Sequence, residues 1–432
     1  MQPTCFTERR HERGQTIVLV AVSIVSLLAM AALAIDVVTL YVARTEIQRA
    51  ADAAALAGAK AIADSGVTTL PAGDPSCTDA VTLAQTMANA AITAVLPNNL
   101  VSGTAPTLIS ANFTNLSGCP SNDPEVTVTL QRTGLPTFFA HIWGTRAAST
   151  GASATAEAYN PANSGGSFTP IAPRNVKPFL VANLDPLNPP NAFINTATGA
   201  VESGVIGETF NLTADCGNGA TCAPPDNPPK VITAKHEVEY LPALVSANTS
   251  NYVCPLCGGA TDFEMSIKCS DENAYQYLSC GGGATNAQWD ATVIPQGGAT
   301  HETEDGALCL IHATSEGAGS GQDTLDKTLW PTGPMQITAE SGPQSGNKVS
   351  TSSSIVSIPI IDQTNIVGSS VTIVGYLQAF INFVADGTGG TTADDLNVTV
   401  LNVVGCGTTN NGATPIQGGN GTSPIPVRLI TP

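Results

Sequence analysis

The chain has 432 residues, of which 42% are hydrophobic and only 12% are charged, with 41 Gly and 30 Pro. Ordinary soluble proteins carry roughly 25% charged residues, and so many turn-forming residues favour β-structure over long soluble helices. The formal net charge is -18 and no basic patch is visible, which excludes a typical nucleic-acid-binding protein. The length allows two or three domains of roughly 100–200 residues each.

An uncharged apolar segment, Thr16–Ile35, follows a basic flank that contains Arg9, Arg10 and Arg13. A helix of that length spans about 30 Å, which is the thickness of the hydrocarbon core of a bilayer. The positive-inside rule places the preceding residues 1–15 in the cytoplasm and exports the remainder. No later stretch is judged long and apolar enough to span a membrane.

A cleaved signal peptide is the alternative, because Ala29-Met30-Ala31 and Ala32-Leu33-Ala34 both offer a small-x-small cleavage pattern. The apolar run is longer than the usual core of a signal peptide, and the helical pattern continues past Asp36 without a break. We therefore favour an uncleaved anchor. Asp36 itself is either a polar cap at the membrane interface or a helix-packing contact.

Small and apolar side chains recur at helical spacing beyond Asp36, and the helix is expected to end at Asp64-Ser65-Gly66. The recurring positions are Val37, Leu40, Ala43, Ile47, Ala50, Ala54, Ala57 and Ala61. A face of small residues lets another helix or a sheet approach closely. The candidate residues for membrane and helix packing are Asp36, Ala50, Ala54, Ala57, Gly58 and Ala61.

The next elements alternate between helix and strand patterns. A second helix is expected over about Thr78–Leu96, ended by Pro97. Strands are expected over Glu125–Gln131 and Ala147–Tyr159, because their side chains alternate in character. Thr137–Trp143 forms a compact aromatic patch between these strands.

The N-terminal region resembles that of TadE/TadG-like proteins of the bacterial Tad (Flp) pilus-assembly system. The resemblance is carried by Arg13-Gly14-Gln15, Ala34-Ile35-Asp36 and the run QRAADAAALAGA from Gln48 to Ala59. It covers residues 10–160 approximately. It implies a pilin-like domain and a non-enzymatic role in a pilus-assembly or secretion system. It further implies an inner-membrane, single-pass location and other Tad/Flp or pseudopilin components as partners.

Two features of that family are absent from the sequence. Pilins processed by the Tad prepilin peptidase carry Gly at the cleavage site and Glu five residues later, whereas Leu19 lies five residues after Gly14. The TadG-like branch sometimes carries a von Willebrand-type domain with an Asp-x-Ser-x-Ser metal site, and no such motif occurs. The resemblance therefore implies an anchor that stays in the membrane.

The predicted fold class is α+β. A cytoplasmic tail and a transmembrane helix lead into a small pilin-like α/β domain over residues 36–160. A Pro- and Asn-rich linker over 161–190 precedes a β-rich, sandwich-like, disulfide-containing region over 191–432, with a Cys-rich insert at about 210–320. The strand candidates of this region are Lys177–Val181, Lys230–Ala234, Ser353–Ile361, Ser370–Val384, Leu396–Val404 and Pro426–Ile430.

The ten cysteines that follow the apolar segment are candidates for disulfides in an oxidising compartment. They are Cys77, Cys119, Cys216, Cys222, Cys254, Cys257, Cys269, Cys280, Cys309 and Cys406. Cys77 and Cys119 flank the second helix, and Cys216 and Cys222 suggest a local bridge. Cys254-Pro-Leu-Cys257 favours a structural disulfide over redox chemistry or over a zinc site that also uses Cys269 and Cys280.

No other motif predicts chemistry. His301 and Glu304 belong to an acidic stretch without HExxH spacing, His141 is expected to pack in the aromatic patch, and His236 is expected to be exposed. Neither GxSxG nor GxxxxGK[ST] occurs, so no enzyme activity, cofactor, metal or nucleotide is predicted. The alternative functions are an exported surface-binding or adhesion protein, with carbohydrate as one ligand class, and a metalloenzyme centred on residues 250–312.

Overall fold

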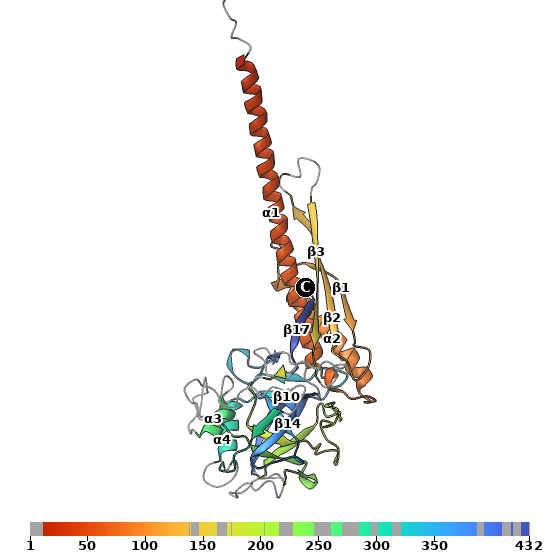
Figure 1. Ribbon diagram of the computed structural model, residues 1–432, viewed down its shortest axis with the longest axis vertical. Helices are drawn as coiled ribbons and strands as arrows, with labels where there is room; N and C mark the ends of the chain where they lie inside the picture. Colours follow the sequence, from red (N-terminus) through yellow and green to blue (C-terminus); the bar gives the residue numbers. More distant parts are fainter. Residues whose placement is uncertain are drawn as a thin grey trace, which may run out of the picture.

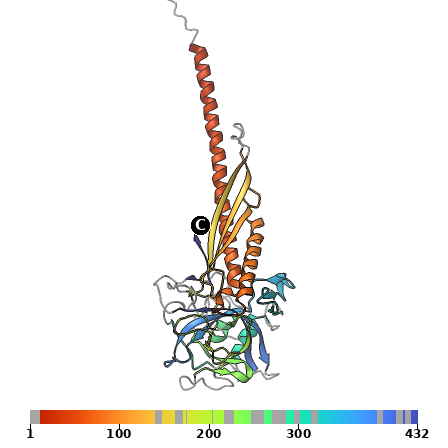
Figure 2. The same ribbon diagram turned by 90° about the vertical axis from the view of Figure 1, so that its right-hand side faces the viewer.

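The computed structural model describes most of the chain. The described residues are 12–137, 139, 147–161, 171–173, 175–202, 204–215, 228–245, 261–269, 285–293, 295, 301–312, 321–386, 393–407, 416–417 and 425–431. The predicted α+β class is confirmed: a long apolar helix leads into mixed helices and sheets that contain a disulfide. Figures 1 and 2 show the N-terminal half of the helix projecting beyond the rest of the molecule.

The long helix α1 (Glu12–Asp64) has 53 residues, so it is about 80 Å long. It ends as the sequence predicts, because Gly66 adopts the left-handed conformation with φ of 81° and its N–H donates to Ala63 O. Such a glycine is a common helix terminator. The second helix α2 (Cys77–Val95) packs beside the C-terminal half of α1. The 3-10 turns Val67–Thr69 and Leu96–Asn98 follow α1 and α2.

Among the described residues, two helices are long and apolar enough to cross a membrane. The second is α2, for which the sequence predicts no span, so that expectation was too strict. α2 buries Ala80, Ala84, Ala88 and Ile92 in the same core as the C-terminal half of α1. The core helix of a soluble protein can reach the same length and apolar content, so these two properties of α2 do not indicate a membrane span.

The N-terminal sheet has four antiparallel strands in the order β1-β2-β3-β17. Their bounds are β1 (Thr107–Thr114), β2 (Glu125–Pro136), β3 (Ala147–Ala158) and β17 (Val427–Thr431). Alternate residues of β2, namely Val126, Val128 and Leu130, face the helices and are fully buried. Side chains of β2 therefore point alternately towards the helices and away from them, and the inward ones pack in the core with α1.

The strand β17 comes from the far end of the chain. The sequence predicts Pro426–Ile430 as part of the β-rich region, whereas the structure pairs β17 with β3. Arg428 forms an ion pair with Glu157, and its guanidinium lies 5.1 Å from the ring centre of Tyr159. The last strand thus completes the N-terminal sheet, beside α1 in Figure 1.

A larger eight-stranded sheet forms the β-rich region, in the order β13-β5-β8-β6-β15-β14-β9 with β7 paired to β8. Its long strands are β5 (Phe179–Ala182), β6 (Thr209–Ala214), β8 (Glu237–Pro242), β13 (Ile355–Ile361), β14 (Ser370–Asp386) and β15 (Ala393–Gly405). Its short edge strands are β7 (Val231–Ile232) and β9 (Thr285–Gln288). Because β13 pairs with both β5 and β14, these six long strands close into a ring.

The sequence predicts a sandwich-like region, which would have two separate sheets. The structure instead has one sheet that closes into a ring. Its core contains alternate residues of the six strands, including Phe179, Tyr240, Phe210, Ile358, Leu377 and Val398. The helices α3 (Asp262–Lys268) and α4 (Glu302–Leu310) add Phe263 and Leu310 to the same core. The ring centres of Phe179 and Phe263 lie 6.3 Å apart.

Part of the expected linker belongs to this core. The strand β5 lies within residues 161–190, and Phe179, Leu180 and Val181 are fully buried. The remaining short strands are β4 (Ile171–Ala172) and β16 (Ile416–Gln417), which pair with each other, and β10 (Thr324–Asp326), β11 (Gln336–Thr338) and β12 (Lys348–Val349), which form a small sheet. The 3-10 turns Thr233–Lys235 and Gly342–Gln344 complete the described elements.

Candidate functional site

The N-terminal half of α1 exposes its large apolar side chains. Ile17, Leu27 and Ile35 expose 69%, 65% and 51% of their surfaces. A continuous apolar surface of this kind is stable only in an apolar environment or against a partner. Since the segment also has the length of a bilayer span, the helix is suited to a membrane anchor.

Asp36 lies at the C-terminal end of the predicted span and is only 4% exposed. Its Oδ2 accepts a hydrogen bond of 3.0 Å from the backbone N–H of Phe139, in the connection between β2 and β3. Of the other expected aromatic-patch residues, Thr137 is described and the rest, including His141, lie outside the described residues. The carboxylate therefore joins the helix to its own sheet.

The small-residue face of α1 packs against other elements of the same chain. Ala50, Ala54 and Ala61 belong to the N-terminal core, whereas Ala57 is only half-buried. Gly58 marks the closest approach, because a Cβ there would lie 3.0 Å from Ile92 Cδ1 and 3.2 Å from Val126 Cγ1. The face expected to admit a helix or a sheet thus meets both α2 and β2.

The opposite face of α1 remains exposed just beyond the predicted span. Val38, Tyr41 and Val42 expose 61%, 68% and 50% of their surfaces. At 3.6 residues per turn these positions lie across the helix from the buried Asp36 and Ala43. An apolar surface on this side is free for contact with another molecule.

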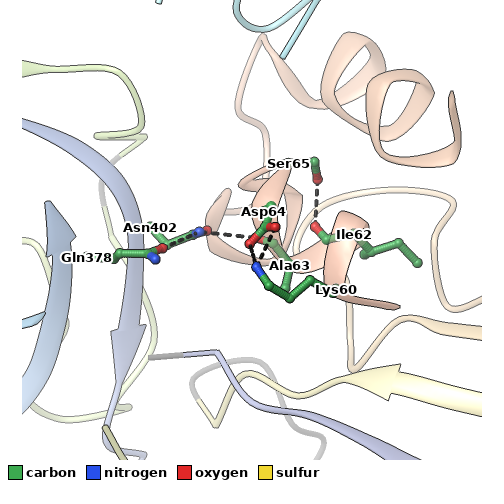
Figure 3. Close-up of polar contacts among 7 residues, drawn as sticks. All are labelled: Lys60, Ile62, Ala63, Asp64, Ser65, Gln378 and Asn402. Atoms are coloured by element: carbon green, nitrogen blue, oxygen red, sulfur yellow. Dashed lines mark hydrogen bonds and ion pairs between the residues drawn. The ribbon is translucent and has the colours of Figure 1, made fainter. Parts of the chain in front are cut away.

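The C-terminal end of α1 is fixed to the β-rich region through buried amide groups (Figure 3). Asn402 on β15, which is 1% exposed, donates 3.1 Å to Ala63 O and 2.9 Å to Gln378 Oε1 on β14. The pairing of β14 with β15 shifts register next to Asn402, at Leu401. A bulge of this kind redirects side chains, and here it brings an amide to a carbonyl in the last turn of the helix.

Further polar contacts surround this junction. Thr69 Oγ1 lies 3.2 Å from Asn402 Oδ1 and accepts a 3.2 Å hydrogen bond from Val403 N. Asn160 Nδ2 donates to Thr68 O at 2.8 Å, and Trp330 Nε1 donates to Ser65 O at 3.2 Å. The segment after α1 is therefore held by residues of the β-rich region and by Asn160, which follows β3.

Asn402 and Gln378 are not among the site residues predicted from the sequence. Both interrupt strongly apolar strand stretches, Leu396–Val404 and Ser370–Val384, and a polar residue in such a stretch is a signal for a buried contact. The partner on α1 could not be identified from this signal, because it is a backbone carbonyl 339 residues away.

The cysteines contribute stabilising links in the described part of the chain. Cys77 and Cys119 form a disulfide with Cα atoms 5.9 Å apart, which joins the start of α2 to the chain before β2. Cys269, Cys309 and Cys406 are also disulfide-bonded. The other candidates, Cys216, Cys222, Cys254, Cys257 and Cys280, lie outside the described residues.

The histidine candidates form no site among the described residues. His301 Nδ1 lies 3.3 Å from Glu304 Oε2, one turn along the chain at the start of α4. His236 ends the 3-10 turn before β8 with φ of 51°. Within the described ranges, no group of three or more His, Cys, Asp or Glu side chains could hold a metal ion.

The N-terminal part of the chain is similar to a known protein family. Residues 14–61 match the family model described as "Tad: Putative Flp pilus-assembly TadE/G-like". This match confirms the resemblance of the N-terminal region and covers the span, Asp36 and most of the packing face of α1. No curated protein and no solved structure matches the chain.

Proposed function

We propose that this protein is a non-enzymatic, membrane-anchored component of a Tad/Flp-type pilus-assembly or secretion system. It acts by packing α1 against helices of other components and by presenting the surface of its exported β-rich region. Residues 1–15 stay in the cytoplasm and residues 16–35 cross the bacterial inner membrane. The pilin-like unit, residues 36–160, uses the C-terminal strand β17 to complete its sheet.

The observation that carries the proposal is the two-sided character of α1 just beyond the span. One side is used by the protein's own sheet, through contacts such as the hydrogen bond between Asp36 and Phe139. The other side exposes Val38, Tyr41 and Val42. Exposed apolar groups clustered on one face mark an interaction surface, and a neighbouring helix that leaves the same bilayer fits this place.

The junction at Asn402 supports a structural role for the β-rich region. Its bonds to Ala63 O and Gln378 Oε1 are buried, and buried polar contacts of this type fix one arrangement of two elements. The orientation of the exported surface then follows the orientation of the anchor. A component that positions other subunits requires such a link, whereas an anchor that only tethers cargo does not.

Site-specific photocrosslinking in cells that express the Tad apparatus tests this proposal. A photoreactive residue at Tyr41 should capture other Tad/Flp components, because this position is exposed beyond the span. The matched position is Ile47, which lies on the buried face and is fully inaccessible. Crosslinks from Ile47 should stay within the chain.

Capture of pilus components from Tyr41 and not from Ile47 supports the packing function. If Tyr41 crosslinks only to lipid, or if both positions behave alike, α1 has no partner helix and the proposal fails. Capture of glycans by the β-rich region alone, with no Tad component bound, favours the alternative of a surface-binding protein.

A further inference from the structure

A cavity of about 350 Å³ lies in the β-rich region, where α3 and α4 begin. Three acidic side chains line it, Asp262, Asp290 and Glu302, together with the apolar side chains of Phe263, Val245 and Val293. Pockets for small ligands have volumes of roughly 300–1,000 Å³. The cavity therefore has room for a small group, and one part of its wall is acidic while another is apolar.

Glu302 is the unusual member of this wall. It is 8% exposed, and its Oε2 has no hydrogen-bond partner among the described residues. Burial raises the pKa of this carboxyl, a hydrogen bond from Thr261 opposes the rise, and the charges of Glu264 and Asp290 add to it. A buried carboxylate oxygen without a hydrogen-bond partner costs free energy. A positively charged group bound beside Glu302 would offset this cost.

The chain supplies no such group within the described lining, which contains no Lys or Arg. Lys268, on α3, has its Nζ 3.0 Å from Glu264 Oε1, so it already serves a different carboxylate. A cation from outside the chain would meet Glu302 at a side chain that is only 8% exposed. Charge-assisted hydrogen bonds are strongest in such surroundings.

The type of cation follows from the arrangement of the lining. The described residues offer no group of acidic side chains close enough together to hold a metal ion, whereas the acidic wall continues into Phe263, Val245 and Val293. An ammonium group provides three hydrogen-bond donors, and an attached alkyl stem gains by apolar contact.

We propose that this cavity binds a primary alkylammonium group, with Glu302 as its main anionic partner and the side chains of Phe263, Val245 and Val293 around its stem. The net charge of -18 favours the approach of cations in general. Two sources share this chemistry, a free small amine and a lysine side chain of another protein. The inference is independent of the function proposed for α1, since it uses no residue of that helix.

The test uses the full chain in detergent micelles and follows the unfolding temperature during titration with 1-butylamine. 1-Butanol serves as the neutral probe of the same shape, and sodium chloride controls for ionic strength. A capped tripeptide with a central lysine, paired with its norleucine analogue, represents the protein source. Because a ligand stabilises only the state that it binds, the titration yields an apparent Kd.

We expect 1-butylamine, the lysine peptide or both to raise the unfolding temperature, with no rise from 1-butanol or the norleucine peptide. Glu302→Gln should weaken the apparent Kd by at least about tenfold, which corresponds to the loss of one charge-assisted hydrogen bond. The matched variant Asp305→Asn lies in the same turn of α4 but is exposed, and it should bind as the native chain does. Val293→Phe, which fills the cavity, should also abolish the rise.

If only 1-butylamine raises the unfolding temperature, the site binds a free amine. If the lysine peptide raises it, the site binds a lysine side chain of a partner protein. Equal binding by the Glu302→Gln variant overturns the inference, as does an equal response to 1-butanol. The absence of any rise from both ammonium probes in the native chain also overturns it. Failure here leaves the crosslinking test of α1 unaffected, so the two proposals can be judged separately.

Discussion

At the scale of single residues, Asn402 shows how one buried amide joins two parts of the molecule. A helix leaves its last carbonyl groups without partners inside the helix. Ala63 O receives one bond from Gly66 N at 3.4 Å and a shorter one, at 3.1 Å, from Asn402. The helix end is therefore completed by a residue from the opposite end of the sequence.

Replacing Asn402 with Ala should lower the free energy of unfolding by about 1–3 kcal/mol, because it leaves buried acceptors on Ala63 and Gln378 without this donor. Urea titration of the full chain in micelles measures the change. The fluorescence of Trp330, whose Nε1 donates to Ser65 O, should report loosening at the junction. The exposed Asn286 provides the control, and Asn286→Ala should change stability by under about 0.5 kcal/mol. Equal effects of both variants would argue against a special role for Asn402.

Glu239 makes the stability of the β-rich region depend on pH. Burial, together with the charge of the neighbouring Asp215, raises its pKa to about 7 from the ordinary 4.5, while the N–H of Lys230 opposes the rise. Between these two values the folded chain retains a proton that the unfolded chain has released. Stability contributed by this group is therefore present below pH 4.5 and is lost as the pH rises towards 7.

Glu239→Gln should remove part of this decline, so the variant should lose less stability than the native chain between pH 5 and pH 8. Urea midpoints at the two pH values measure it. Burial also raises the pKa of Glu208 to about 7, so a second change, Glu208→Gln, should flatten the profile further. Glu340→Gln, at an exposed position, should keep the native slope. A native profile that rises over this range would contradict the assignment.

At the scale of elements, the close contact of α1 with α2 and β2 depends on Gly58. Gly58→Val should cost about 1–3 kcal/mol, because its side chain would collide with Ile92 and Val126. Ala57→Val is the matched change, since it introduces the same β-branched side chain one position earlier, at a half-buried site. Thermal unfolding should separate the two. If both variants lose the same amount, helix propensity and not packing explains the loss.

The disulfide between Cys77 and Cys119 should stabilise α2 and β1 more than the rest of the molecule. It closes a separation of 42 residues, and a loop of this size is worth about 2–4 kcal/mol when cross-linked. Changing both cysteines to Ser should therefore speed amide hydrogen exchange in α2. Exchange in β13, within the closed ring, should be unchanged. Uniform acceleration across both elements would show that the disulfide stabilises the whole chain as one unit.

The elements with local signals were predictable. The end of α1 at Asp64, the position of α2 and the alternation of β2 all follow from periodicity and from Gly66, Pro97 and neighbouring residues. The pairing of β17 with β3 and that of β13 with β5 were not predictable, because each joins strands that are distant in sequence. For the candidate site, the run of alanines predicted the packing face of α1. It did not predict that α2 and β2 would pack against this face.

At the scale of the whole molecule, the last strand of the chain belongs to the N-terminal unit. The N-terminal sheet takes its last strand from residues 427–431, and the end of α1 is held by β15. The β-rich region is thus attached to the N-terminal unit by both backbone pairing and side-chain bonds. A rotation of α1 would consequently turn the β-rich region with it.

This attachment predicts a fixed geometry between α1 and the β-rich region. Spin labels carried on non-canonical residues at Tyr41 and Val367, both highly exposed, leave the cysteines untouched. Their distance distribution in micelles should be a single narrow peak. Inserting a short Gly-Ser segment between Ser65 and Gly66 displaces the helix end from Asn402 and should broaden the peak, because flexible linkers sample many separations. The same insertion between Gly342 and Pro343, in an exposed turn, should leave the peak narrow. A broad distribution in the native chain would mean that the region swings freely from its anchor, and the junction would then carry no orientation.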